Sequence, residues 1–129
     1  MIDRTNAPGL SQPPGYSHAV VASGRRLVTT AGAVPRDAEG NLVGAGDIHA
    51  QARQTLENLE LALGAVGATG RDVIKMTVYV VADERGDLSA VWVAVQESGI
   101  AGAASTLLGV SMLAVEGQLV EMEVIAVLE

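Results

Sequence analysis

Two carboxylates near the end of the chain are the clearest candidates for chemistry. Glu121 and Glu123 lie in residues 119–128, where one set of alternating positions is wholly apolar. Because successive side chains of a strand point to opposite faces, both acids share the other face, whose remaining positions are also apolar. Such a face meets either water or another subunit around a polar pocket. In the second case one carboxylate could accept and return a proton as a general base and acid.

The other reactive residue types give weaker signals. His18 and His49 are the only histidines and lack a paired ligand spacing, so we expect no metal site. We expect His18 to be a hydrogen-bonded strand residue or else a substrate contact, and His49 to face solvent. No serine has a Gly-x-Ser-x-Gly context and the chain has no cysteine, which excludes thiol nucleophiles and disulfides.

Composition narrows the possible partners. The 129 residues carry a net charge of −7, and none of the eight Lys and Arg residues follows Arg85. Nucleic-acid binding requires a basic face, so we expect no nucleic-acid partner. Hydrophobic residues make up 49% of the chain, and a small domain leaves some of this material outside, where a partner subunit can cover it. With no signal-peptide pattern and no convincing membrane segment, we expect a soluble, cytoplasmic protein.

The hydrophobic pattern predicts the elements that position these residues. We expect one domain, residues 1–129, with the element order β-β-α-β-α-β-β and two helices on one face of a mixed sheet. The first fifteen residues read as an extended arm or loop. Asp47 and Asp87 are the predicted N-caps of the two helices. The predicted elements are a hairpin of strands 16–22 and 27–33, a helix over 48–66, a strand over 73–81, a second helix that ends near Gly99, and strands over 106–113 and 119–128.

Five blocks of sequence, in order, resemble the Rid family (reactive intermediate deaminases, also called YjgF). The blocks are residues 16–20, 27–35, 51–59, 73–80 and 119–127. The resemblance implies a chorismate-mutase-like fold and a homotrimer with three clefts between subunits. In the deaminating branch these clefts hydrolyse enamines and imines, such as 2-aminoacrylate and its imine tautomer, to keto acids and ammonia without a cofactor.

The resemblance also implies roles for individual residues. Tyr16 would line the cleft, the backbone of Ala31 and Gly32 would meet the substrate, and Glu121 rather than Glu123 would position the attacking water. The remaining residues of the implied substrate-binding set are Ala104, Ser105, Thr106 and His18.

Ala104 departs from the pattern of the deaminating branch, which has an arginine there to grip the substrate carboxylate with a bidentate pair. Because no basic residue follows Arg85, we expect no nearby cation to replace it. The chain resembles a branch that lacks this arginine, and weak activity on simple 2-imino acids is expected. Whether an arginine of a neighbouring subunit reaches the cleft stays open; the candidates are Arg25, Arg26, Arg36 and Arg85.

Three functions therefore compete. The first is a trimer that binds or hydrolyses a small reactive metabolite other than a simple 2-imino acid. The second is a non-catalytic trimer on the same scaffold, which binds a small ligand or another protein. The third, a ribonuclease or translation inhibitor as some relatives are labelled, is disfavoured by the acidic chain.

Overall fold

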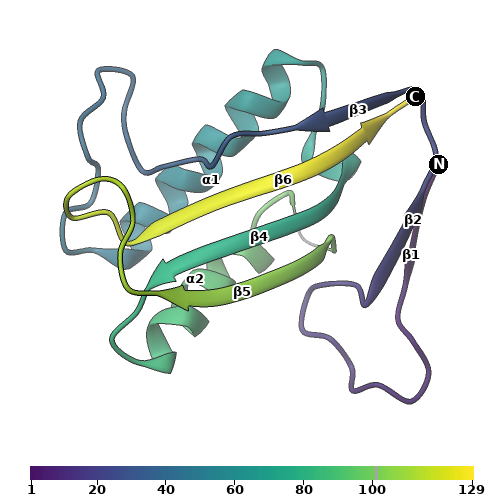
Figure 1. Ribbon diagram of the computed structural model, residues 1–129, viewed down its shortest axis with the longest axis horizontal. Coiled ribbons are helices and arrows are strands. Elements are labelled where there is room, and N and C mark those ends of the chain that lie inside the picture. The colour runs from purple at the N-terminus through teal and green to yellow at the C-terminus, as the bar shows by residue number, and fades with distance from the viewer. Residues whose placement is uncertain (101) are drawn as a thin grey trace.

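A four-stranded mixed sheet forms the centre of the protein. The computed structural model describes residues 1–100 and 102–129. The strand order is β3 (Arg26–Thr29), β6 (Val120–Leu128), β4 (Val73–Val81) and β5 (Ala104–Val110). β4 and β5 are parallel, whereas β6 is antiparallel to both of its neighbours. Figure 1 shows the two long strands, β4 and β6, side by side in the middle. The predicted mixed sheet is confirmed.

Two helices cover one face of this sheet (Figure 1). α1 (Ile48–Ala65) begins as predicted, because the Asp47 carboxylate accepts a hydrogen bond of 3.1 Å from the backbone nitrogen of Ala50. α2 (Arg85–Gln96) begins two residues earlier than Asp87, so the prediction of Asp87 as N-cap was wrong. Glu84 is the N-cap, and Asp87 reaches back to the backbone nitrogen of Glu84 in a capping box. Of the helices in the described residues, none combines the length and hydropathy that a membrane crossing requires.

The core lies between the helices and the inner face of the sheet. Alternate apolar residues of the two central strands point into this core. Val120, Met122 and Ala126 of β6 are fully buried there, as are Met76, Val78 and Val80 of β4. Leu59 and Leu63 of α1 and Val91 and Val95 of α2 close this layer from the other side. A short 3-10 helix, Gly70–Asp72, leads from α1 into β4. The buried side of β6 therefore fixes which of its residues remain for the opposite face.

The N-terminal region differs from the prediction. β2 (Ala19–Ala22) pairs with β1 (Ile2–Thr5), which lies in the predicted extended arm or loop, and these two strands form a separate sheet at one side of the molecule (Figure 1). The predicted hairpin with the next strand was wrong, because β3 pairs with β6 instead. Gly24 explains the change of direction: a Cβ there would lie 2.6 Å from the carbonyl oxygen of Leu128, so the turn packs on the end of β6. From Ala19 onward the predicted order of elements is confirmed.

Two leucines of α1 test this packing. Leu59 is fully buried, whereas the Leu61 side chain on the same helix is 72% exposed. We expect Leu59→Ala to lower the free energy of unfolding by about 2–5 kcal/mol, because the truncation leaves a cavity against the sheet. Leu61→Ala should change it by less than about 0.5 kcal/mol. Urea unfolding at equal protein concentrations compares the two, and equal effects would contradict the packing described here.

Candidate functional site

The sheet face opposite the helices carries a row of polar side chains across its two central strands. Glu121 and Glu123 of β6 lie on this open face, both half-buried, next to Tyr79 and Thr77 of β4. The same face is apolar toward β3, where the Leu27 side chain is 70% exposed and pairs with Val127. The open face is therefore an exposed apolar surface with two acids at its centre.

Glu121 is held from two sides. Its Oε1 accepts a hydrogen bond of 3.1 Å from the side-chain amide of Gln118. On its other side lies Gly32, where a Cβ would collide with Oε2 of Glu121 and lie 2.7 Å from its Cδ. Two backbone hydrogen bonds between Ala33 and Met122 fix this segment against β6. The structure therefore brings Glu121 and Gly32 together, with Ala31 exposed beside them.

Gln118 is a site residue that the sequence analysis missed. It is 97% buried, and its Oε1 accepts from the backbone nitrogen of Val115, which directs its NH₂ group toward Glu121 and the carbonyl of Val120. The fully buried Gln51 of α1 bonds to the carbonyl of Gly117 and the backbone nitrogen of Leu119, on either side of Gln118. The bonds of Gln51 that fix this turn have no local sequence signal, because they join residues 66 and 68 apart in sequence.

Glu123 has a different partner from Glu121. The Tyr79 hydroxyl donates a hydrogen bond of 2.5 Å to Glu123. This bond stabilises the neutral phenol and, with desolvation and the charges of both glutamates, raises the pKa of Tyr79 above its usual value near 10. The Glu123 carboxylate is thus engaged within the sheet. This difference in partners supports Glu121 as the acid that remains for a ligand.

Tyr16 lies in a separate hollow at the edge of the sheet. A cavity of about 250 Å³ is lined by Tyr16, Pro14, Trp92, Ser105 and Leu107. The Tyr16 ring makes an edge-on contact with Trp92 of α2, at a centroid distance of 6.2 Å. Tyr16 therefore lies beside the edge strand β5, on the side of α2.

His18 and Ser105 make structural hydrogen bonds around this hollow. The backbone nitrogen of Ala7 donates to Nδ1 of His18 at 2.9 Å, which holds the N-terminal arm to β2. The Ser105 hydroxyl donates to the carbonyl of Ala103. His18 is hydrogen-bonded as expected, but it directly precedes β2 rather than lying in the predicted strand. A substrate contact by His18 stays a prediction.

Ala104 and Thr106 face the other way. Residues of β5 alternate, so Ser105 points to the helix side while Ala104 and Thr106 share the open face with Lys75 and Thr77, their partners on β4. Lys75 donates a hydrogen bond of 3.0 Å to the Thr106 hydroxyl. The expectation that no cation lies near Ala104 was wrong, because the parallel register places Lys75 directly beside it.

One chain therefore does not assemble the whole predicted set. Glu121, Gly32, Ala104 and Thr106 belong to the open face, whereas Tyr16 and Ser105 belong to the hollow beside α2. β4 separates the strand of Glu121 from the strand that borders Tyr16. A site that uses both Glu121 and Tyr16 needs a second subunit.

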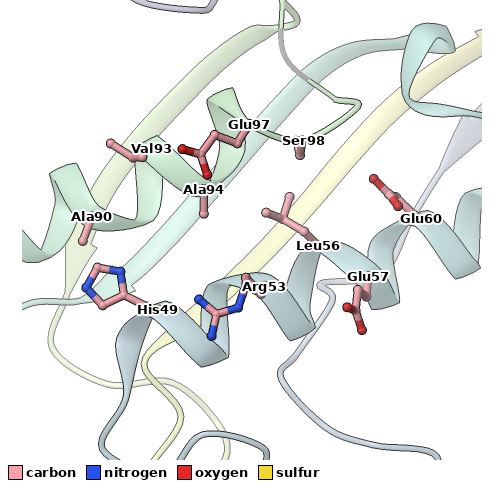
Figure 2. A pocket seen from close by; sticks show the side chains of 10 residues that line it. All are labelled: His49, Arg53, Leu56, Glu57, Glu60, Ala90, Val93, Ala94, Glu97 and Ser98. Atoms are coloured by element: carbon pink, nitrogen blue, oxygen red, sulfur yellow. The ribbon is translucent and has the colours of Figure 1, made fainter.

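A larger groove runs between the two helices, on the side away from the open face. It measures about 430 Å³, and Figure 2 shows His49 and Arg53 of α1 on one wall and Val93 and Glu97 of α2 on the other. His49 is exposed, as predicted. None of the predicted site residues lines this groove.

Comparisons with known proteins agree with the fold. Solved structures share this α+β arrangement of two helices on a mixed sheet. One is a Rid family protein of unknown function from Yersinia pestis, with 34% identity, coverage of 98% of both chains and a TM-score of 0.88. Another is TdcF from E. coli with bound serine, with 27% identity, coverage of 100% of this chain and 98% of that one, and a TM-score of 0.70.

The sequence comparisons define the family. A sequence model described as Endoribonuclease L-PSP matches residues 6–128, so the chain belongs to this family, which includes the YjgF, RutC and Rid proteins. A RutC family protein of Pyrococcus horikoshii is 40% identical over 61% of this chain, and a 2-iminobutanoate/2-iminopropanoate deaminase of Salmonella typhimurium is 43% identical over 42% of it. These matches span 60% and 41% of the length of the two relatives.

The close approach of Gly32 to Glu121 gives a direct test of the site geometry. Gly32→Ala should lower the free energy of unfolding by about 1–3 kcal/mol, because the added methyl overlaps the carboxylate. Glu121→Ala in the same chain should recover most of this loss, with a coupling of about 1 kcal/mol or more in the double-mutant cycle.

Gly64→Ala is the matched control, because a Cβ there meets nothing within 4 Å. It should leave stability unchanged or raise it slightly, since alanine is the better helix former. Additive effects of Gly32→Ala and Glu121→Ala would contradict the contact.

Proposed function

We propose that this protein is a homotrimeric, cofactor-free hydrolase of small reactive imines or enamines. Its clefts lie between subunits, with Glu121 from one subunit and Tyr16 from its neighbour. The observation that carries the proposal is the environment of the half-buried Glu121. The buried Gln118 holds its carboxylate by a hydrogen bond, and the neighbouring Gly32 has no side chain that would cover it. A structural scaffold has no need to hold a carboxylate in this way. The partial match to an imine deaminase supports the same chemistry.

The proposed reaction uses groups that the chain itself provides. Glu121 accepts a proton from a water molecule as the water oxygen bonds to the imine carbon, which gives a tetrahedral carbinolamine. The same carboxyl group returns this proton to the nitrogen, which completes the carbinolamine. It then accepts the proton of the carbinolamine hydroxyl and passes it to the nitrogen as the C–N bond breaks and the C=O bond forms, so the products are a keto acid and ammonia and the carboxylate is restored. The Tyr16 hydroxyl of the neighbouring subunit donates a hydrogen bond to the substrate. The backbone of Ala31 and Gly32 provides polar contacts beside Glu121.

The open face supports the proposed trimer. Leu27 and Ile125 are exposed there, next to the two glutamates. Such an apolar face with a polar centre is typical of a subunit interface. The predicted site residues are divided between the open face and the hollow beside α2. This division also supports a trimer, because a neighbouring subunit packed on the open face could supply the Tyr16 that the site lacks.

Two alternatives remain. A non-catalytic trimer that binds a small ligand or another protein is favoured by Ala104, which lacks the charge that grips a substrate carboxylate. Endoribonuclease activity, after the family's description, is disfavoured by the charge: the net charge is −7, and the open face presents Glu121 and Glu123 against the single cation Lys75 among its described residues. An RNA backbone would meet repulsion there.

Matched variants of the two glutamates test the proposal. Imine generated in place by an amino-acid oxidase should be hydrolysed by the wild-type protein, more slowly than by an arginine-bearing relative by up to about a hundredfold. Glu121→Gln should lower the rate by a further factor of about 100 or more, because it removes the proton acceptor. Glu123→Gln, whose side chain is engaged by Tyr79, should lower it less than about tenfold.

Light scattering is the control, and both variants should keep three times the chain mass of 13.2 kDa. Glu121→Gln with the wild-type rate in an intact trimer would refute the catalytic role. Equal rates in buffer and protein would favour the non-catalytic alternative.

A further inference from the structure

The open face contains one cation that its surroundings leave without a carboxylate partner. Lys75 of β4 is half-buried, and among the described residues no carboxylate lies within 4 Å of its ammonium group. A Lys ammonium carries three donors. One of these is accounted for by the Thr106 hydroxyl at 3.0 Å. The remaining donors are available for an anion.

The neighbouring acids are held away from Lys75. Glu123 lies diagonally across from Lys75 on β6, since Thr77 pairs with Glu123 and Lys75 with Ile125. Side chains at such diagonal positions can reach each other. The Tyr79 hydroxyl instead holds the Glu123 carboxylate. Glu121 pairs with Tyr79, four residues along β6 from Ile125, and is thus beyond the diagonal neighbours of Lys75.

The register leaves space beside this lysine. Lys75 pairs with Ala104 in the parallel ladder, so their side chains share the open face at a strand spacing of about 4.8 Å. Ala104 has only a methyl group, which cannot cover the ammonium. Thr106, two residues further along β5, adds a hydroxyl on the same face. An ammonium and a hydroxyl beside a small alanine side chain suit a small carboxylate.

We propose that Lys75 binds the carboxylate of a small 2-imino or 2-oxo acid on the open face, with Thr106 orienting its ammonium. The inference rests on the proposed function for the identity of the ligand. From the neighbouring strand β4, Lys75 supplies the positive charge that Ala104 of β5 lacks. As a point charge without the fork of a guanidinium, it binds a carboxylate less rigidly than arginine does, which agrees with slow turnover of simple imino acids.

Arg4 is the other cation near the start of β5, but its geometry suits a different task. Its Nη2 donates to the carbonyls of Arg71 and Val73, so the guanidinium holds β1 against the start of β4. Lys75 has no such backbone bonds among the described residues. The two cations therefore differ in function: Arg4 holds the arm, and Lys75 faces the ligand.

Pyruvate and its uncharged amide, pyruvamide, test the proposal by calorimetric titration of the full-length protein. Lys75→Met should weaken pyruvate binding by at least about tenfold, because a charge-assisted hydrogen bond is lost. Lys75→Arg should stay within about threefold of wild type, and pyruvamide binding should be the same in every variant. Lys75→Met combined with Ala104→Arg should regain pyruvate binding, since the charge returns to the adjacent position.

Arg53→Gln is the matched control for net charge, because Arg53 lies in the groove between the helices (Figure 2). It should bind pyruvate as the wild type does. Light scattering shows that each variant keeps its assembly, and the double variant tests the charge even where Lys75→Met alone is unstable. Wild-type pyruvate binding in Lys75→Met, an equal loss in Arg53→Gln, or no pyruvate binding by the wild type would overturn the proposal.

Imine turnover, measured on the same preparations, separates this inference from the proposed hydrolysis. Lys75-dependent pyruvate binding without any turnover would leave the carboxylate site in place and refute the hydrolase. Imine turnover together with pyruvate binding that Lys75→Met does not weaken would support the hydrolase and refute the carboxylate site at Lys75.

Discussion

A strand residue can face only one side of its sheet, and β6 depends on this constraint more than any other element. Its even-numbered residues, from Val120 to Leu128, are buried against the two helices. Glu121 and Glu123 must therefore lie on the opposite face, two residues apart along the strand. The same packing that stabilises the fold thus places the acids, and a shift of one residue in register would bury both carboxylates in the core.

Much of this arrangement follows from local sequence. The bounds of α1 and β4 could be predicted because Asp47 caps a clear apolar stripe and residues 73–81 are rich in β-branched side chains. The pairing of β1 with β2 could not, because Ile2–Thr5 is polar and short and its partner lies some distance along the chain. The same limit applies to the site: local alternation places Glu121, but the contacts of Gln51 around Gln118 and the Lys75–Ala104 pair join segments far apart in sequence.

The structure changes how the missing arginine is understood. Considered along the chain, Ala104 has no basic neighbour, which suggested a cleft without a carboxylate anchor. In the sheet it lies beside Lys75, and the acid diagonal to this lysine, Glu123, accepts a hydrogen bond from Tyr79. Charge on this face is thus arranged by hydrogen bonds rather than by direct ion pairs. A cation kept apart from nearby acids is suited to an exchangeable anionic ligand.

In the proposed trimer, each cleft combines Glu121 of one subunit with Tyr16 of its neighbour. Subunit exchange between two inactive variants, Tyr16→Phe and Glu121→Gln, tests it most directly through imine turnover. In a cyclic trimer every mixed assembly contains one cleft with both native residues, so an equal mixture should recover about a quarter of the wild-type rate. If Glu121 and Tyr16 of the same chain formed the site, every cleft would remain defective, and the absence of any recovery after exchange would contradict the account.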